Sequence, residues 1–528
     1  MRRTVIFHPF FISIAPALAL YALNALKLRI MDALPTIVFI PVITLGIWLL
    51  INKAIKHPRK SGALVSIYSA LFFSFGIFPV MVSLANGFFH VDLAPWIYGN
   101  FILNSLILLA IWCLLFYIVW VVTVRSHSDF HLLTRFLNVV SVVLIATTGY
   151  QALRNFSIYH RISQLDLGVS IDQLDSSASL SSFPAINTSL PDIYYIILDG
   201  HGRSDIHREF FSYDDSNFIA ELQQLGFYVA GESFANYGLT HLSLASSLNM
   251  VYLDEIIQQI GADTISYAPM DSLIQNNTTA EYLQNIGYTN VVFASEFSPD
   301  APRPADIFIS PPGILNAYQI ELVNMTPLRI PLYKSLYDAH RAKIQYTFAK
   351  LPEIASNDQP TFTFVHILAP HPPFVFDANG NGVNPTREYN ISDGSHFTDV
   401  LGKDEYTQGY LEQVQYIDKQ TIILVKEILA KSDQAPIIIL QGDHGPGSMF
   451  DFENLEKSFL PERMAILNAY YFPGQDNSQL YPAITPVNSF RLIMKQFLHA
   501  PLTLLPDETF YCTKIQPYNL IKITDRLR

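Results

Sequence analysis

Residues 436–447 read PIIILQGDHGPG, and this stretch indicates the fold more clearly than any other. Its first half is a short, continuously apolar run, which is typical of a strand buried on both faces. Its second half is a glycine-rich turn that carries Asp443 and His444. The stretch IYYIILDG at 193–200 repeats the pattern and places Asp199 directly after its last apolar residue. Strands buried on both faces indicate a parallel sheet covered by helices.

The rest of the chain after residue 190 alternates in the same way. The runs NVVFAS (290–295) and FTFVHIL (362–368) predict two further strands, and helix-like stretches lie at 214–225, 241–253 and 408–431. Short apolar strands separated by helices are typical of α/β domains. We therefore predict an α/β domain with a mostly parallel central sheet over residues 191–528.

Acidic and imidazole side chains follow two of the predicted strands. Asp199 follows one of them, and Asp443 and His444 follow the other. In an open α/β sheet ligands bind at the carboxyl ends of the strands, and these side-chain types bind divalent metal ions. An Asp-Gly pair after a strand is also a common turn, so each residue alone is a modest signal. Together they predict a metal site.

A threonine stands at the predicted start of a helix. In ANYGLTHLSLASSLNMVYL (235–253), Thr240 comes directly before an apolar-periodic segment. The simplest interpretation is an N-cap that accepts hydrogen bonds from free backbone N–H groups. The alternative is a nucleophile, because a helix N-terminus attracts the phosphate or sulfate that such a hydroxyl attacks. Ser243 is the rival nucleophile, although one turn into the helix it is expected to be less exposed.

Two histidines lie in the segment FVHILAPHPPF (364–374). His371 stands among prolines that hold the backbone rigid, so we expect a fixed imidazole that contacts an anionic substrate or protonates a leaving group. His366 lies within the predicted strand, and the simpler interpretation is a core histidine whose nitrogens are satisfied. The alternative is that His366 and His371 together hold a second metal ion.

The first 153 residues differ in character from the remainder. Apolar runs long enough to cross a bilayer occur at about 4–26, 33–52, 61–85, 98–124 and 136–152. We predict a helical membrane domain of about five spans over 1–153, followed by a polar, Ser-rich linker over 154–190. The first run follows two arginines, so a signal peptide is the alternative, but the run is long and has no clear cleavage site.

Charge distribution predicts the orientation of this anchor. With the N-terminus inside, eight of the cations before residue 150 fall in cytoplasmic segments, and only Lys27 and Arg29 fall in outer loops. An odd number of spans then places residues 191–528 outside the cytoplasm, in a multi-pass protein of the cell membrane. An even number would reverse this. Residues 151–528 carry a net charge of −19, which argues against a nucleic-acid partner.

These elements together resemble the alkaline phosphatase and sulfatase superfamily. With the leading membrane spans, the chain looks like the branch of lipoteichoic acid synthases and phosphoethanolamine transferases. The resemblance rests on the strand followed by Asp199-Gly200, the threonine about forty residues later, the PHPPF segment, and DHG at 443–445. It covers most of 191–500 and implies a sulfatase-like fold.

The resemblance also implies roles for individual residues. Asp199, Asp443, His444 and Thr240 match the positions that bind one divalent metal ion, Mn²⁺, Mg²⁺ or Zn²⁺. Thr240 also matches the nucleophile that becomes covalently substituted. His371 matches the histidine that contacts the transferred group.

Arg463, in ERMAILNAYYFPG, resembles a recurring element after DHG. Its alternative role is a structural ion pair with Glu462 or Asp443.

Two departures from the superfamily patterns narrow the chemistry. Sulfatases mature a Cys or Ser in a CxPxR-like motif, and residues 236–246 contain nothing of that kind. Phosphoester chemistry is therefore favoured over sulfate-ester chemistry. Two-zinc members carry an additional Asp-x-x-x-His pair, which has no convincing equivalent between residues 361 and 377. This favours one tightly held ion.

The predicted function is metal-dependent transfer of a phosphoryl-linked headgroup from a lipid donor to an envelope acceptor, through a covalent adduct on Thr240. The predicted partners are a lipid-linked or other envelope phosphoester substrate and the membrane. A hydrolase of phosphate or sulfate esters is the first alternative, because water can replace the acceptor. The second is a non-catalytic binding module in the envelope.

Overall fold

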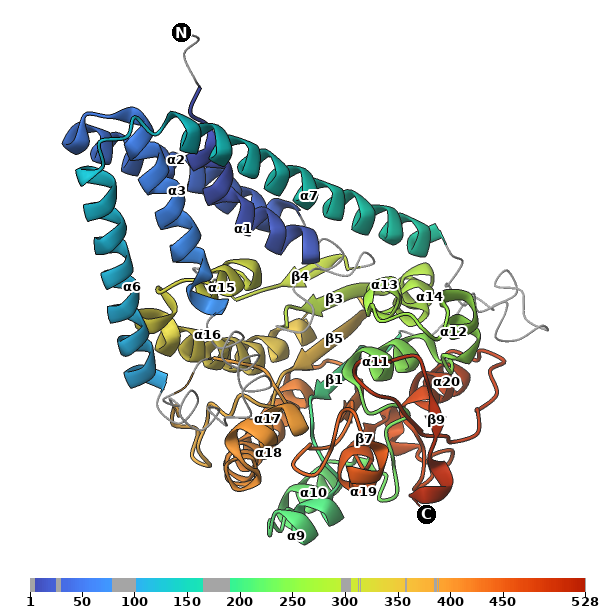
Figure 1. Ribbon diagram of the computed structural model, residues 1–528. Coiled ribbons are helices and arrows are strands. Elements are labelled where there is room, and N and C mark those ends of the chain that lie inside the picture. Colours follow the sequence, from blue (N-terminus) through green and yellow to red (C-terminus); the bar gives the residue numbers. More distant parts are fainter. Residues whose placement is uncertain are drawn as a thin grey trace. The chain divides into compact units, whose positions relative to one another are not determined.

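The computed structural model describes residues 5–24, 30–77, 101–164, 190–295, 305–311, 313, 315–356, 359–383, 387 and 389–527. The chain divides into two compact units (Figure 1). The helical unit comprises residues 1–161, 313–336 and 385–389, and the α/β unit comprises 162–312, 337–384 and 390–528. A stretch far from the N-terminus in sequence therefore belongs to the helical unit.

Apolar helices make up most of the helical unit. They are α1 (His8–Asn24), α2 (Ile30–Ile55), α3 (Pro58–Ser74), the 3₁₀ turn η1 (Phe75–Ile77), α6 (Phe101–Arg125) and α7 (His131–Gln164). Within the described residues, three segments are long and apolar enough to cross a membrane, Ala33–Ile55, Ile102–Arg125 and His131–Asn155. These three confirm predicted spans. α1 and α3 have 17 residues each, and the end of the predicted span 61–85 lies outside the described residues, so the count of five stays a prediction.

Side-chain exposure in these helices is inverted relative to a water-soluble protein. Large apolar side chains such as Val42, Leu50 and Val122 are more than half exposed. Small polar side chains lie between the helices instead, and the Thr44 hydroxyl donates to Ser13 Oγ over 2.8 Å. Helices with apolar outward faces are stable in a bilayer, where the lipid is the solvent.

The helix α7 continues beyond the predicted end of the anchor. It ends at Gln164, so the first part of the predicted linker 154–190 is helical. The rest of that linker up to residue 189 lies outside the described residues. Backbone extended as a strand resumes at Ile193.

A seven-stranded sheet forms the centre of the α/β unit, with strands in the order β2-β7-β6-β1-β5-β3-β4. The strands are β1 (Ile193–Leu198), β2 (Tyr228–Val229), β3 (Thr289–Phe293), β4 (Ile307–Ile309), β5 (Thr361–Ile367), β6 (Ile437–Gln441) and β7 (Asn468–Tyr471). β1 pairs in parallel with β5 and β6, whereas β7 pairs antiparallel with β6 and β2. The prediction of a mostly parallel sheet is confirmed. A small antiparallel pair, β8 (Phe510–Tyr511) and β9 (Ile521–Lys522), lies near the C-terminus.

Helices surround this sheet (Figure 1). They are α9 (Ser204–Phe210), α10 (Ser216–Gln224), α11 (Thr240–Asn249), α12 (Asp254–Ile260), α13 (Ala268–Gln275), α14 (Thr278–Asn285), α16 (Arg329–Lys350, which begins in the helical unit), α17 (Ser395–Leu401), α18 (Lys403–Lys431), α19 (Leu460–Met464) and α20 (Pro486–Phe497). The 3₁₀ turns are η3 (Leu351–Ser356), η4 (Leu455–Lys457), η5 (Pro473–Gln475) and η6 (Thr524–Arg526). All six residues of β1 are buried. Both faces of the central strand are therefore covered, as its continuous apolar sequence predicts.

Candidate metal centre

The carboxyl ends of three adjacent strands bring the predicted ligands together. Asp199 follows β1, Asp443 and His444 follow β6, and His366 lies near the end of β5. β1 is the neighbour of both other strands, so parallel pairing carries these side chains to one edge of the sheet. Each of the four is at most 5% exposed. Sequence positions more than 240 residues apart thus form one buried cluster.

The nitrogen and oxygen atoms of this cluster lie close enough to one another to form hydrogen bonds or to share a metal ion. His366 Nε2 lies 2.9 Å from Asp199 Oδ2. His444 Nε2 lies 3.2 Å from Asp443 Oδ2 and 3.6 Å from Asp199 Oδ1. One ligand atom each from Asp199, His366 and Asp443 lies within 4.8 Å of the others, a spacing that allows the three to share an ion.

Two carboxylate oxygens of the cluster are buried in a way that favours a bound cation. Asp199 Oδ1 and Asp443 Oδ2 are buried and accept no hydrogen bond from the described residues. Burying a charged oxygen without a partner is costly, so such oxygens call for a compensating positive charge. Two carboxylates together with imidazole nitrogens are a suitable donor set for Zn²⁺ or Mn²⁺. The residues therefore fit a divalent metal ion.

His444 directs the lone pair of its Nε2 toward this position. Burial, followed by the nearby charge of Arg463, lowers the pKa of His444 to about 4. Its ring is therefore neutral at pH 7. Nδ1 lies 3.0 Å from the Gly445 carbonyl oxygen, which only an N–H can bond, so the lone pair is on Nε2. A neutral imidazole whose other nitrogen is held by a carbonyl is the form that ligates metals.

Asp199 and His366 form a buried hydrogen-bonded pair across the two strands. Burial raises the pKa of Asp199, but the charges of His371 and His366 and the hydrogen bond from His366 outweigh it and lower that pKa. Burial lowers the pKa of His366, and the hydrogen bond to Asp199 outweighs it and raises the pKa. His366 is buried and both its ring nitrogens have partners, Nε2 with Asp199 and Nδ1 with Ser295 Oγ over 3.5 Å, as the simpler interpretation predicts. One of those partners is a predicted metal ligand, so a metal role for His366 stays a prediction. Binding of a metal by His366 requires loss of its proton.

Thr240 is the first residue of α11, and Leu239 is the N-cap. The interpretation of Thr240 as the N-cap is therefore wrong. Its Oγ1 lies 3.0 Å from His444 Nε2, and the residue is 9% exposed. The hydroxyl thus faces the cluster from the positive end of a helix dipole, which favours an anionic group beside it.

Ser243 is less suited to be the nucleophile. It is 2% exposed, and its hydroxyl donates to the Asp443 carbonyl oxygen over 2.7 Å. A hydroxyl engaged in that bond holds the metal-ligand loop in place. Thr240 is the hydroxyl that the fold leaves beside the carboxylates.

His371 lies beside the cluster on the proline-rich loop. Its backbone N–H donates to the Asp199 carbonyl oxygen over 2.9 Å, and Nδ1 lies 2.6 Å from the Pro372 carbonyl oxygen. Nε2 is left facing Asp393 Oδ2 at 3.7 Å, and the side chain is 11% exposed. The loop therefore holds an imidazole at the edge of the site, as the prolines predict.

Asp393 is a site residue that sequence reasoning missed. It is 4% exposed, accepts a hydrogen bond from Tyr406 over 2.6 Å, and forms an ion pair with Arg463. Burial raises the pKa of Asp393, but the charges of Arg463 and His371 outweigh it and hold that pKa far below its ordinary value. It follows no strand and stands in an Asp-Gly pair that indicates only a turn, so the sequence held no signal for it.

The predicted partner of Arg463 is corrected by this geometry. Arg463 pairs with Asp393, and its guanidinium also donates to the carbonyl oxygens of Gly238 and Gly445 over 2.9 and 3.2 Å. Glu462 instead accepts hydrogen bonds from Ser448 and Met449. Arg463 thereby links the backbone before Thr240 to the turn after His444.

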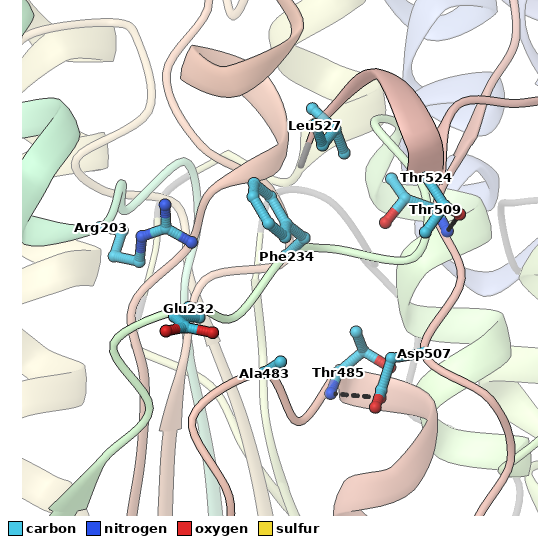
Figure 2. A pocket seen from close by; sticks show the side chains of 9 residues that line it. All are labelled: Arg203, Glu232, Phe234, Ala483, Thr485, Asp507, Thr509, Thr524 and Leu527. Carbon is cyan, nitrogen blue, oxygen red and sulfur yellow. Dashed lines mark hydrogen bonds between the residues drawn. The ribbon is translucent and has the colours of Figure 1, made fainter.

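A separate cavity of about 600 Å³ lies elsewhere in the α/β unit (Figure 2). Arg203 and Glu232 line one side, and Thr485 and Asp507 lie on another (Figure 2). The Arg203 guanidinium is paired with Asp205 over 2.7 and 2.8 Å. No residue of the metal cluster lines this cavity. This cavity is therefore distinct from the predicted metal site.

Comparisons with known proteins agree with this architecture. The family model described as Sulfatase matches residues 191–490. The match spans more than half of the chain, which therefore belongs to the sulfatase family. It combines a sulfatase-like catalytic domain with N-terminal membrane helices. No curated protein matches this sequence.

Solved structures with a similar chain path have low sequence identity. The C-terminal periplasmic domain of EcEptC from Escherichia coli is 12% identical, covers 66% of this chain and 95% of its own, and has a TM-score of 0.43. The soluble domain of lipooligosaccharide phosphoethanolamine transferase A from Neisseria meningitidis is 10% identical, covers 63% and 94%, and has a TM-score of 0.38. The protein BT33494S-sulf of Bacteroides thetaiotaomicron, from a study of the metabolism of multiple glycosaminoglycans, is 14% identical, covers 58% and 72%, and has a TM-score of 0.36.

Proposed function

We propose that the protein is a metal-dependent, membrane-anchored phosphotransferase. It moves a phosphoryl-linked headgroup from a lipid donor to an envelope acceptor through a covalent adduct on Thr240. One observation carries the proposal: the Thr240 hydroxyl lies 3.0 Å from His444 Nε2, in the cluster whose Asp199 and Asp443 each have a buried oxygen without a hydrogen bond.

Asp199, Asp443, His444 and Thr240 are the proposed ligands of one divalent ion, and His366 is an additional candidate. When bound, the ion supplies Lewis-acid chemistry that lowers the pKa of the threonine hydroxyl and stabilises negative charge on phosphoryl oxygens. The N-terminus of α11 adds backbone N–H groups and a favourable dipole for the same charge.

The first displacement forms a bond between Thr240 Oγ1 and phosphorus and breaks the bond between phosphorus and the lipid alcohol. The proton of the threonine hydroxyl goes to solvent, and His371 in its imidazolium form donates the proton that the leaving alcohol needs. His371 suits this role because its loop holds Nε2 at the edge of the site, 3.7 Å from Asp393 Oδ2.

The second displacement frees the threonine. An acceptor hydroxyl attacks the phosphorus of the Thr240 adduct, the bond to Oγ1 breaks, and neutral His371 takes the proton of the acceptor. Thr240 Oγ1 regains its own proton from solvent, which restores the hydroxyl. When water is the acceptor, the same two steps describe a hydrolase. Residues 236–246 contain no CxPxR-like motif, which favours phosphate over sulfate as the transferred group.

The membrane helices support a lipid-linked or other envelope substrate, because they keep the catalytic domain next to lipid headgroups. We propose that this domain lies outside the cytoplasm. The cations of the N-terminal region support that orientation, since eight of ten fall in segments assigned to the inside.

The test is release of diacylglycerol from labelled phosphatidylglycerol and phosphatidylethanolamine by the full-length protein in detergent, with Mn²⁺, Mg²⁺ or Zn²⁺. We expect metal-dependent release that Thr240→Ala lowers by roughly a thousandfold or more, because the nucleophile is lost. Ser246→Ala is the matched control, since this hydroxyl on the same helix donates to the Val251 carbonyl oxygen and faces away from the site. We expect it to retain activity.

Acid-quenched protein is then analysed by mass spectrometry for a headgroup phosphate on Thr240. Transfer of the label to an added acceptor supports the transferase, whereas label found only as free headgroup phosphate supports the hydrolase. Absence of release from both lipids with every metal would contradict the proposal for these donors.

A further inference from the structure

Residues 313–336 leave the α/β unit between β4 and β5 and belong to the helical unit. They include α15 (Ala317–Asn324) and the first turns of α16. α15 has a complete capping box, in which Asn316 and Gln319 bond each other's backbone N–H groups over 2.9 and 3.0 Å. The segment is thus locally ordered and lies against membrane helices (Figure 1).

Side-chain hydrogen bonds join this segment to two of those helices. The Tyr318 hydroxyl donates to the Ala17 carbonyl oxygen of α1 over 2.8 Å, in a buried position. Gln319 Nε2 donates to Thr36 Oγ1 of α2 over 3.2 Å. Both bonds come from adjacent residues of α15, which sets the position of the helix along its neighbours.

Apolar packing surrounds these bonds. Tyr318 is 1% exposed and Leu322 is 8% exposed, and both pack with Ala17 and Ala33. Small alanines allow the tyrosine ring to approach the helix backbones closely. Burial of a tyrosine removes a large apolar surface from solvent, so this contact favours the docked position.

A glycine permits the closest approach. Gly76 follows α3, and its N–H donates to the Met325 carbonyl oxygen over 3.0 Å. A Cβ at this position would lie 2.4 Å from the Asn324 carbonyl oxygen and 2.7 Å from Met325 Cα. Backbone atoms cannot yield as a flexible side chain can, so only glycine fits here without displacing the segment.

These contacts lie toward one end of the helical unit, near the start of α2 and the end of α3. The opposite end is rich in cations, where Arg59 pairs with Asp129 over 3.4 Å and Lys60 Nζ donates to the Ser126 carbonyl oxygen over 2.6 Å. Cation-rich ends of membrane helices face the cytoplasm. The end that contacts residues 313–336 is therefore the outer one.

We propose that residues 313–336 form an intramolecular docking element that binds the outer ends of α1, α2 and α3. The catalytic chain is then attached to the membrane helices twice, covalently through residues 165–189 and non-covalently through this element. The inference goes beyond the proposed function and does not depend on it, because its readout is attachment rather than activity.

The test uses full-length protein in native membranes, with a protease site placed within residues 165–189. After cleavage and a salt wash, we expect the C-terminal fragment to stay with the membranes. Gly76→Val should raise the released fraction about tenfold or more. The valine side chain would clash with the backbone of Asn324 and Met325, and the steric strain would weaken binding of the segment to the helices. The matched control is Gly149→Val in α7, where a Cβ meets nothing within 4 Å.

Crosslinking provides a measurement that does not depend on a destabilising variant. Thr36→Cys with Gln319→Cys, in a chain whose Cys113 and Cys512 are replaced by serine, should be joined by a short bismaleimide across the cleaved linker. Gly149→Cys with Gln319→Cys is the control pair and should not be joined. Release of the unmodified fragment, equal retention of the Gly76→Val fragment, or absence of the Thr36–Gln319 crosslink would each overturn the proposal.

Discussion

Two groups of buried histidines and aspartates lie close together in the α/β unit, and their hydrogen bonding differs. In the first, the His–Asp network of His201, Asp418, His207 and Asp215, every carboxylate oxygen has a partner. Asp418 bonds His201 Nε2 over 2.8 Å and the Tyr213 hydroxyl over 2.7 Å. In the second, the metal cluster, Asp199 and Asp443 each retain an oxygen without a hydrogen bond.

This difference distinguishes a structural network from a candidate metal centre. Asp215 bonds His207 Nδ1 over 2.9 Å and also Ser204, and His207 Nε2 lies 3.0 Å from the Tyr410 hydroxyl. Tyr410 accepts from Gly202 N–H over 3.1 Å and donates to the Gly200 carbonyl oxygen. The network thus holds the loop after Asp199 in position. Residue types alone do not separate the two groups, whereas the completeness of hydrogen bonding does.

The largest effect is expected from Asp443→Asn, which removes a charged ligand from the metal cluster. Loss of this carboxylate should lower metal affinity by at least roughly a hundredfold, and diacylglycerol release should fall with it. Mutating a residue that only hydrogen-bonds to a metal ligand already costs about 10–100-fold in affinity, and removing a charged ligand itself should cost at least as much. Isothermal titration with Mn²⁺ and Zn²⁺ measures the affinity. The control is Asp418→Asn, which should bind metal with unchanged stoichiometry. Equal affinity in Asp443→Asn and the unmodified protein would contradict the assignment.

Asp418→Asn should instead destabilise the fold. Removing one partner of a buried charged pair costs about 3–5 kcal/mol, and the His201 and Asp418 side chains are 1% and 3% exposed. Urea unfolding of the detergent-solubilised protein, followed by far-UV circular dichroism, measures the change. If Asp418→Asn kept its stability but lost metal binding, the His–Asp network would be part of the metal site and not a structural network.

The pH dependence of stability offers a smaller and more specific test of the network. Burial raises the pKa of Asp215, but the hydrogen bond and charge of His207 outweigh it and lower the pKa. The resulting stabilisation is present above the ordinary carboxyl pKa and is lost as pH falls through the lowered value. The difference in Tm between the unmodified protein and Asp215→Asn should therefore be largest near pH 7 and shrink in acid. A difference that grows in acid would contradict the assigned charge pair.

Ser243→Ala should have the smallest effect. It removes one hydrogen bond to the Asp443 carbonyl oxygen, which is worth about 1 kcal/mol, while the nucleophile and all proposed ligands remain. We expect a lower Tm and a slight decrease in metal affinity, measured by thermal unfolding and titration. A loss of activity as large as that of Thr240→Ala would instead identify Ser243 as the nucleophile.

Local sequence patterns predicted most of the α/β fold. Continuous apolar runs located β1, β3, β5 and β6 within a residue or two, because strands in a covered parallel sheet are predominantly apolar. The antiparallel strand β7 was not predicted. Its short segment NAYY carries no signal of direction, which depends on pairing with β6 and β2.

The candidate site was predictable where a residue directly follows a strand or begins a helix. Asp199, Asp443 and Thr240 are of that kind. The sequence did not reveal that the partner of His366 is Asp199, because that contact depends on β1 lying beside β5. Asp393 carried no signal because its partner Arg463 is seventy residues away in sequence.

The sequence by itself determined the elements: apolar membrane helices, buried parallel strands, and acidic or hydroxyl residues at their ends. These follow from local periodicity and from the preference of each residue for water, lipid or the protein interior. Only the tertiary structure decided which distant residues meet, including His366 with Asp199, Arg463 with Asp393, and residues 313–336 with the membrane helices. Such pairings depend on strand order and on contacts between segments that lie from 70 to 301 residues apart in sequence, and a local sequence pattern carries no information about them.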